Sequence, residues 1–178
     1  MHNPQPATCS PQQPKSIRLA MVLLSIFVTG FLFAMAHAED KIIIGTVEDV
    51  ILLPWGVKLP ARIDTGAAAS SLDARNLTIK DDGMAEFYLP EKYGGLKICL
   101  PVVAWRTVKS AGEVKKRPLV EMEICIGSKR FRAHVNLNNR SKMTYPMLIG
   151  RNILKESFLV DTTRIMCVPP VCPEASQK

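Results

Sequence analysis

The chain has 178 residues, with 23 Lys and Arg against 16 Asp and Glu, which gives a net charge of +7. This length accommodates one ordinary domain. The basic residues are scattered, except for the Lys-Lys-Arg at 115–117, and aromatic residues do not interleave with them. The composition therefore does not favour a nucleic-acid-binding protein.

Residues 1–38 have the features of a secretory signal. Two basic residues precede an apolar run over 19–35, and the Ala-His-Ala at 36–38 fits the small-residue cleavage motif. The sequence therefore predicts a cleaved signal peptide at 1–38 and a mature domain at 39–178 that is periplasmic or secreted. An uncleaved membrane anchor is the alternative, because the run is close to the ~20 residues that a transmembrane helix needs.

The mature segment predicts a mainly β domain. The β-branched stretch 41–53 is broken at Gly45, which fits one bent strand or two successive strands. The Pro-Trp-Gly at 54–56 is a predicted turn. Short apolar or alternating runs predict the other strands, at 57–63, 76–80, 85–90, 96–108, 119–127, 128–139, 146–150, 158–161 and 164–168.

Three segments carry further detail. Residues 119–124 alternate, so even and odd positions face opposite sides of a sheet, and 128–139 is the expected hairpin partner with a turn near Gly127-Ser128. The polar segment 110–118 predicts a hairpin tip or mobile loop. Residues 151–157 are the best helix candidate, about two turns long.

Four cysteines lie in the mature segment, and export allows them to form disulfides. Cys167 and Cys172 enclose Val-Pro-Pro-Val, which suggests a small closed loop. Cys99 and Cys125 lie in strand-like runs and can pair across neighbouring strands. Buried free thiols are the alternative, and the sequence leaves the pairing open.

The sequence does not indicate a metal site. No C-x-x-C occurs, and His134 is the one histidine after residue 38, whereas structural zinc takes four Cys or His ligands at close spacings. Neither the H-E-x-x-H metalloprotease motif nor the G-x-x-x-x-G-K-[ST] nucleotide-binding motif is present. A metallohydrolase that uses Asp64 and His134 remains an alternative, which metal analysis of the pure protein would test.

A single carboxylate stands where the apolar segment 57–63 ends. The stretch Ala-Arg-Ile-Asp-Thr-Gly-Ala at 61–67 is followed, further along the chain, by Pro-Met-Leu-Ile-Gly-Arg-Asn at 146–152, which leads into the predicted helix. This pairing resembles the retropepsin-like aspartic proteases, and more narrowly their bacterial branch, formerly labelled ATP-dependent zinc proteases. The resemblance spans roughly residues 42–164. It implies a mainly β, retropepsin-like closed β-barrel or sheet fold with one short C-terminal helix.

The resemblance also implies a role for each residue of the two motifs. Asp64 is the expected catalytic acid, and Thr65 hydrogen-bonds to the same loop of a second copy. Gly66 lets the backbone approach that loop closely. Small side chains from Ala67 onward leave room for a substrate backbone. The complete set of site-supporting residues is Thr65, Gly66, Ala67, Gly150, Arg151 and Asn152.

Aspartic protease chemistry needs two carboxylates. Peptide hydrolysis requires an activated water and a proton donor for the leaving amine. Two nearby carboxyl groups that share one proton supply both, because like charges at close range cannot both ionise easily. This chain has one Asp-Thr-Gly, and Asp161 precedes Thr-Thr, which is interpreted as a turn. The resemblance therefore implies a homodimer, with residues 105–118 as the flap over a bound peptide.

One position departs from the family pattern. Retropepsins often carry an Asp directly after Asp-Thr-Gly-Ala, where it pairs with the Arg of the Gly-Arg-Asn segment. This chain has Ala68 there, followed by Ala69. Our hypothesis from the sequence is that Asp73 replaces the missing partner of Arg151.

The sequence thus predicts an exported aspartic endopeptidase, which hydrolyses peptide bonds with a water activated between the two Asp64 carboxylates of a homodimer. Peptides or proteins are the expected substrates. No cofactor and no nucleic acid are expected, and a membrane is involved only if the signal segment is retained. The alternative is a non-catalytic dimeric peptide-binding or regulatory module on the same fold, which the Ala-rich stretch after Gly66 favours.

Overall fold

A computed structural model describes residues 40–110 and 113–172 of the chain. The predicted signal peptide, 1–38, lies outside the described residues, as does the centre of the predicted hairpin tip. None of the helices in the described part of the chain is long and apolar enough to cross a membrane.

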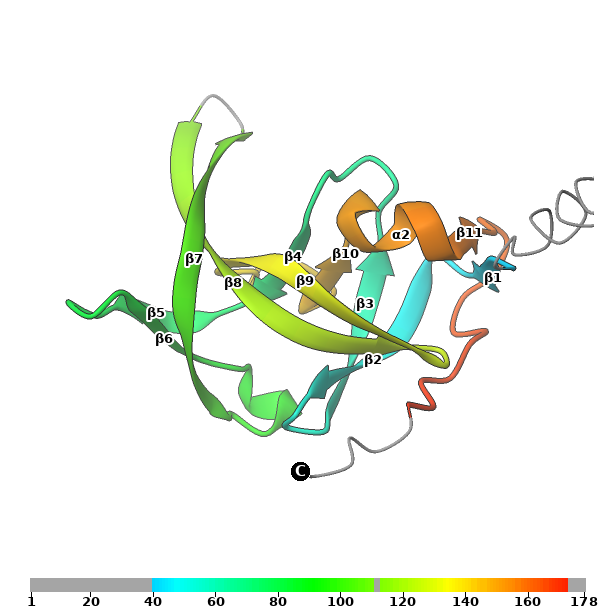
Figure 1. Cartoon of the computed structure of the whole chain (residues 1–178), viewed down its shortest axis with the longest axis horizontal. Helices are drawn as coiled ribbons and strands as arrows, with labels where there is room; N and C mark the ends of the chain where they lie inside the picture. The colour runs from blue at the N-terminus through cyan, green and yellow to red at the C-terminus, as the bar shows by residue number, and fades with distance from the viewer. Residues whose placement is uncertain (1–39, 111–112, 173–178) are drawn as a thin grey trace, which may run out of the picture. The chain divides into compact units, whose positions relative to one another are not determined.

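The described chain is built almost entirely of strands, with one short α-helix and one 3-10 helix (Figure 1). Their order is β1 (Ile42–Ile44), β2 (Val47–Leu53), β3 (Val57–Ile63), β4 (Ser70–Asp73), β5 (Arg75–Ile79), β6 (Met84–Tyr88), η1 (Glu91–Tyr93), β7 (Lys97–Ser110), β8 (Glu113–Ile126), β9 (Lys129–Asn138), β10 (Met147–Ile149), α2 (Arg151–Ser157) and β11 (Phe158–Val160).

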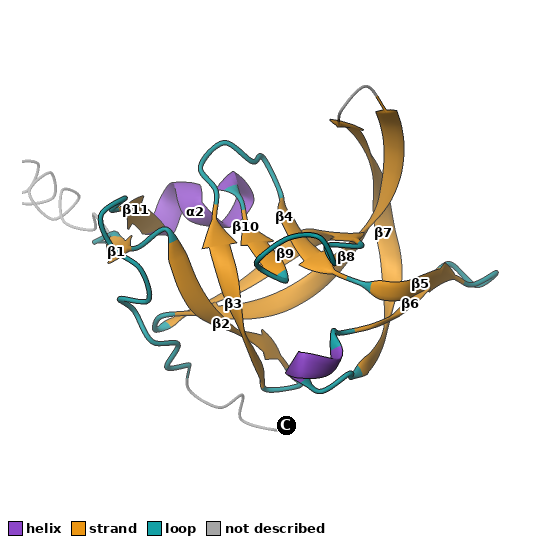
Figure 2. Ribbon diagram, turned by 180° about the vertical axis from the view of Figure 1, so that it is seen from behind, coloured by secondary structure: helices purple, strands orange, loops and turns teal. Residues whose placement is uncertain are grey.

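Six of the strands close on themselves. They are hydrogen-bonded in the order β2-β3-β10-β4-β9-β8, and β8 pairs again with β2 through Ile51 and Cys125. Strands β7, β6 and β5 continue from β8 outside this ring, and β1 pairs in parallel with β11 as a separate ribbon (Figure 2). The fold class predicted from the sequence, a mainly β closed barrel with one short C-terminal helix, is confirmed.

The interior of this ring is apolar because its strands alternate. In β8 the even-numbered residues Val120, Met122 and Ile124 are buried, while Glu121 is exposed, as predicted. Equivalent positions on β2, β3, β9 and β10 complete the core. Burial of large aliphatic side chains contributes roughly 1.5–3 kcal/mol each, so this core is the main source of stability.

Most elements predicted from the sequence are confirmed, including the break at Gly45, the helix at 151–157 and the turn at 127–128. The predicted strand at 164–168 is wrong. The amide of Met166 donates to Val47 O, and the carbonyl of Arg164 accepts from Thr46, so this segment is an irregular strap against the start of β2.

Strand β4 was missed because Ser70-Ser71-Leu72-Asp73 has no strand-like composition, although all four residues are buried. It lies between β9 and β10 in the barrel, paired in parallel with β9 and antiparallel with β10. Two of its polar side chains are satisfied by neighbours, since Ser70 bonds to α2 and Asp73 to two arginines. Tertiary contacts therefore override the local preference.

The disulfide joins Cys125 to Cys172, which neither pairing suggested by the sequence included. It ties the C-terminal strap to the end of β8, and the amide of Val171 donates to Gly127 O beside it. Cys99 is an exposed free thiol. The Cys167 thiol donates to the buried Glu48 carboxylate, and this hydrogen bond raises the pKa of the thiol, with burial adding to it.

Reducing this disulfide is expected to lower the free energy of unfolding by about 2–4 kcal/mol, because the bond closes a loop with a sequence separation of 47 residues. Urea unfolding with and without reductant measures the change. The matched control is Cys99→Ala, because the Cys99 thiol is exposed and unpaired. This variant is expected to leave the unfolding curves with and without reductant unchanged. Equal stability of the oxidised and reduced wild type would contradict a stabilising disulfide between Cys125 and Cys172.

Candidate functional site

Two adjacent parallel strands bring the two sequence motifs together. Strand β10 pairs in parallel with β3, with Ile149 opposite Ile63. The Asp64 amide then donates to Ile149 O at 3.0 Å. The Asp-Thr-Gly loop and the Gly-Arg-Asn segment therefore leave the barrel at the same end, since parallel strands point the same way (Figure 2).

The Asp64 carboxylate is held by its own loop. Its Oδ1 atom accepts from the backbone amides of Gly66, at 2.9 Å, and Ala67, at 3.0 Å. The side chain is half-buried, and Thr65 and Gly66 are exposed. One oxygen is thus fixed by two donors on a tight turn while the group still reaches solvent. This arrangement orients the carboxylate before any substrate arrives.

Arg151 braces the same loop from the first turn of α2. Its Nη1 atom donates to Thr65 O at 2.9 Å and to Gly66 O at 2.7 Å, and its backbone amide donates to Ala67 O at 2.8 Å. The hypothesis that Asp73 replaces the missing partner of Arg151 is therefore wrong. Loop carbonyls take that place, and Asp73 pairs with Arg75.

Asn152 connects the site to the barrel wall. Its Oδ1 atom accepts from both the amide and the hydroxyl of Ser70 at 2.9 Å, and its Nδ2 atom donates to His134 O at 3.0 Å. The Ser70 Oγ atom in turn accepts from the Gly150 amide at 3.1 Å. These bonds cross-link α2, β4, β9 and the end of β10.

Gly150 lies where the two loops approach most closely. A Cβ atom there would lie 2.7 Å from the carbonyl carbon of Ala69 and 2.9 Å from Ala67 O, both backbone atoms. Gly150→Ala is therefore expected to push the loop away from α2, at a cost of about 1–3 kcal/mol in stability. A displacement of this kind should lower the kcat of any reaction that uses Asp64 by about 100-fold.

The matched control for this prediction is Gly83→Ala. Gly83 has a φ of +80° and nothing within 4 Å of its added Cβ, so alanine there costs stability without touching the site. Thermal melting and kcat separate the two variants. Equal activity of Gly150→Ala and Gly83→Ala would contradict the packing argument.

A small pocket of about 220 Å³ opens beside the loop. Three arginines line it, Arg106 and Arg117 from the β7–β8 hairpin and Arg140 from the segment after β9. Burial lowers the pKa of the Arg140 guanidinium, the Arg117 charge lowers it further, and the carboxylates of Asp73 and Asp64 oppose this. The pocket wall thus carries positive charge within electrostatic reach of Asp64. The complete lining is Ala67, Ala68, Ala69, Ser71, Arg106, Val108, Arg117, Asn136, Arg140 and Leu148.

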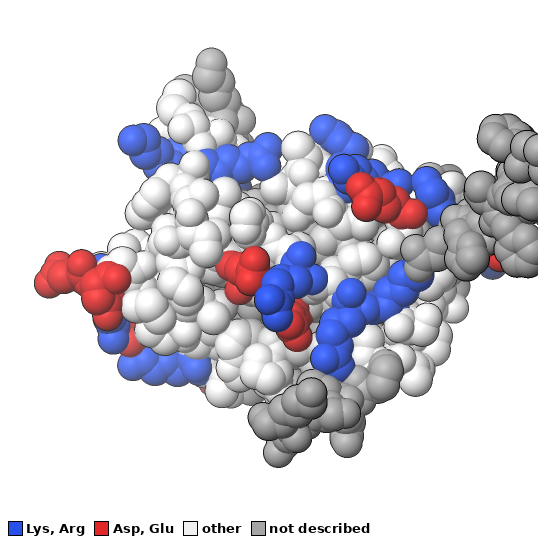
Figure 3. Space-filling view, viewed as in Figure 1, with Lys and Arg blue, Asp and Glu red and all other residues white. Residues whose placement is uncertain are grey.

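The residues predicted as a flap, 105–118, lie in the β7–β8 hairpin, with Arg106 opposite Arg117 and Ser110 opposite Glu113. It projects beyond the barrel on the side of the Asp64 loop (Figure 1). Trp105 is 54% exposed and Val114 is 64% exposed, which leaves apolar surface on the hairpin. Figure 3 shows Lys and Arg side chains at the hairpin and at several other places across this face of the molecule.

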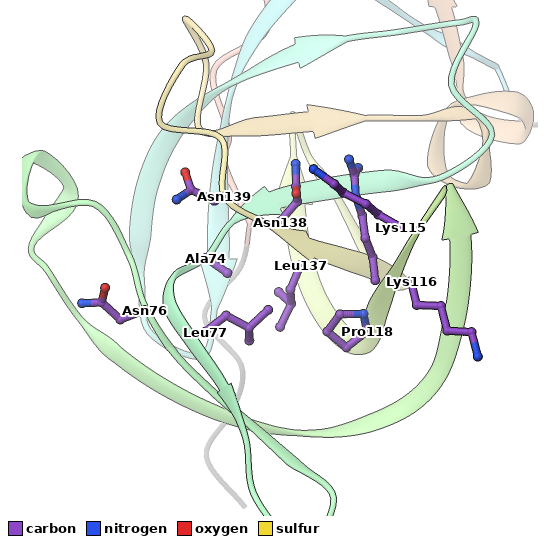
Figure 4. Close-up of a pocket in the computed structure, with 10 residues that line it drawn as sticks. Ala74, Asn76, Leu77, Lys115, Lys116, Pro118, Leu137, Asn138 and Asn139 are labelled. Carbon is purple, nitrogen blue, oxygen red and sulfur yellow. The ribbon is translucent and has the colours of Figure 1, made fainter. Parts of the chain in front are cut away.

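A second, larger cavity of about 540 Å³ lies at the base of this hairpin (Figure 4). Lysines of β8 and asparagines of β5 and β9 surround it, over an apolar floor of Leu77 and Leu137. Arg117 lines both cavities, so the larger one adjoins the small pocket.

The structure brings together every site residue predicted from the sequence: Asp64, Thr65, Gly66, Ala67, Gly150, Arg151 and Asn152. Sequence reasoning missed Ser70, Ser71, Asn136 and the three arginines, because these residues belong to no recognisable motif. His134 contributes a backbone carbonyl to Asn152. Within residues 40–110 and 113–172 no three His, Cys, Asp or Glu side chains cluster as metal ligands would.

The closed barrel with an Asp-Thr-Gly loop braced by a Gly-Arg-Asn segment defines a retropepsin-like protein. The model of the RimB-like family, described as retropepsin-like aspartic endopeptidase RimB, matches residues 43–169. The chain therefore belongs to the RimB-like family, which confirms the resemblance seen in the sequence.

Related proteins of known sequence carry a different name. A probable alpha-L-glutamate ligase of Shewanella halifaxensis is 33% identical over 140 residues, covering 74% of this chain and 31% of that protein. The corresponding protein of Parasynechococcus marenigrum is 32% identical over 132 residues, covering 68% of this chain and 28% of that protein. The chain thus spans about a third of the length of the curated relatives that it matches.

A solved structure shares the fold. The crystal structure of Lpg0085, a protein of unknown function from Legionella pneumophila, has a TM-score of 0.62 and is 34% identical. The match covers 72% of this chain and 98% of that one.

Proposed function

We propose that this protein is an aspartic endopeptidase that works as a homodimer, with Asp64 of each copy forming the catalytic pair. The observation that carries the proposal is the preorganised Asp64 carboxylate, held by the amides of Gly66 and Ala67 and half-buried at the end of the barrel. Membership of a family described as retropepsin-like aspartic endopeptidases supports it.

In this mechanism the two-fold axis of the dimer passes between the loops. An isologous dimer places the same loop of both copies at one point. The exposed Thr65 and Gly66 are the parts of the loop that a second copy would contact. One carboxylate takes a proton from water as it attacks the peptide carbonyl, and the protonated partner donates to the departing amine.

The alternative, a non-catalytic binding module, was favoured by the Ala-rich stretch after Gly66. Ala68 removes the acid that usually pairs with the arginine, but Arg151 has carbonyl partners in the same loop. The loop is therefore held without that acid, which supports the catalytic proposal.

The charge of the pocket supports a proposal for the substrate class. Arg106 and Arg117 have no carboxylate partner within the described residues, and both face the cavity beside Asp64. Unpaired guanidinium groups next to a reactive centre favour an anionic ligand. The relatives are named for a ligase of α-L-glutamate. We infer that the preferred peptides carry acidic side chains near the cleaved bond.

The proposed place of action is the periplasm or the medium outside the cell. The apolar run and the Ala-His-Ala motif of residues 1–38 support this proposal. The disulfide between Cys125 and Cys172 is compatible with an oxidising compartment. N-terminal sequencing of the protein exported by a bacterial host tests it, with a start near Glu39 as the expected result.

Hydrolysis of a denatured protein mixture by the full chain tests the activity. Cleavage that survives EDTA and has a bell-shaped profile between about pH 3 and about pH 8 is expected, because one carboxyl must be ionised and the other protonated. Mass spectrometry of the products shows whether acidic residues flank the cut. A folded dimer without cleavage at any pH, or loss of cleavage in EDTA, would overturn the proposal.

A further inference from the structure

Three buried polar atoms in the described part of the barrel have no hydrogen-bond partner: Ser71 Oγ, Asn136 Oδ1 and Arg117 Nε. All three residues line the same pocket beside the Asp64 loop. Ser71 is 4% exposed and Asn136 is 5% exposed. A buried polar atom without a partner costs roughly 1–3 kcal/mol, so three of them in one small cavity indicate a site built for a ligand.

The orientation of Asn136 is fixed by its other atom. Its Nδ2 donates to Ser70 O at 2.6 Å, so Oδ1 must be the end that points away from Ser70. A flipped amide would place Asn136 Oδ1 against Ser70 O, and two acceptors cannot form a hydrogen bond. Asn136 therefore offers an acceptor to the pocket, while Arg117 Nε offers a donor and the Ser71 hydroxyl can act as either.

Charge decides which ligand group suits this set. Three guanidinium groups line the pocket, and a carboxylate accepts charge-assisted hydrogen bonds from such groups. A carboxamide would leave the positive charge unbalanced. A volume of about 220 Å³ is sufficient for one glutamate-sized side chain.

We propose that Ser71, Arg117 and Asn136 form a specificity subsite for one acidic side chain of the substrate. Arg117 and Ser71 donate to the substrate carboxylate, and Asn136 Oδ1 accepts a main-chain N–H of the same substrate. The proposal rests on the proposed function, because the subsite would bind a side chain of the substrate that is cleaved at Asp64. It adds the residues that recognise an acidic side chain of the substrate.

The test measures binding without turnover. Full-length Asp64→Asn protein is titrated with a short peptide of alternating glutamate and alanine, and with its glutamine counterpart. The glutamate peptide is expected to bind about 10- to 100-fold more tightly, as hydrogen bonds to charged groups predict. Adding Arg117→Met is expected to lower the ratio of the two affinities about tenfold, and adding Ser71→Ala is expected to lower it about threefold.

Lys116→Met is the matched control, because Lys116 is a neighbouring exposed base on β8 that does not line the small pocket. It removes the same charge and is expected to keep the preference within about twofold. Thermal melts check that each variant is folded, and Ser71→Ala carries the test if Arg117→Met does not fold.

Equal binding of the two peptides, or no binding of either, would overturn the subsite. An equal loss with Lys116→Met and Arg117→Met would also overturn it, since only general charge would then matter. A glutamate preference that depends on Arg117, in a protein whose wild type cleaves nothing, would keep the subsite and reject the catalytic proposal.

Discussion

Asp64→Asn is expected to abolish peptide hydrolysis, with a fall in kcat/KM of about 10⁴-fold. The amide oxygen of asparagine can still accept from Gly66 and Ala67, so the loop should keep its shape. What the variant loses is the ionisable group, and in a homodimer both members of the pair are lost together. Cleavage of an acidic peptide, followed by mass spectrometry, measures the effect.

The chain offers a close control in Asp161→Asn. Asp161 also precedes a threonine, and its Oδ1 accepts from the amide two residues on, at 2.9 Å, as Asp64 does. Hydrogen bonds from Thr163, first from its hydroxyl, hold the pKa of Asp161 below its usual value. Asp161→Asn should retain activity. Residual hydrolysis by Asp64→Asn at the level of Asp161→Asn would refute the catalytic role of Asp64.

Asp73→Ala is expected to lower the free energy of unfolding by about 3 kcal/mol. The carboxylate is 2% exposed, pairs with Arg75 at 2.8 Å and accepts from the Arg140 amide at 2.7 Å. Its removal leaves a half-exposed guanidinium and a backbone N–H without their acceptor. Both losses destabilise the folded state, since neither group is fully returned to water.

Asp49→Ala is the control for this stability effect. Asp49 also lies in a barrel strand and pairs with a base, Lys58, at 3.3 Å, but both side chains are substantially exposed. Such pairs contribute at most about 1 kcal/mol. Urea unfolding compares the two variants. If both lose the same stability, burial of Asp73 does not have the assigned effect.

The barrel could be predicted from the sequence where local pattern and tertiary packing agree. Alternation in 119–127 and the glycine break at 45 both gave the correct strands. Strand β4 could not be predicted, because Ser70 and Asp73 are satisfied by residues far away in the sequence, Asn152 and Arg140. The cysteine pairing failed for the same reason, since Cys125 meets Cys172 only through the path of the strap.

The candidate site also has a part that could be predicted from the sequence and a part that could not. Asp64 and the Gly-Arg-Asn segment form motifs with chemical meaning, so their proximity could be anticipated. The partner of Arg151 could not, because backbone carbonyls leave no mark in a sequence. The pocket beside Asp64 joins β4, the β7–β8 hairpin and the segment after β9, and its residues become a group only when the barrel closes.

The central claim, that catalysis needs one Asp64 from each of two copies, is tested most directly by mixing subunits. Wild-type protein at fixed concentration is incubated with increasing amounts of Asp64→Asn, and cleavage of an acidic peptide is measured after exchange. Mixed dimers hold one carboxylate of the pair, so activity should fall steadily as wild-type copies are drawn into them. Activity that stays constant under excess Asp64→Asn, at concentrations where dimers form and exchange, would contradict the shared catalytic pair.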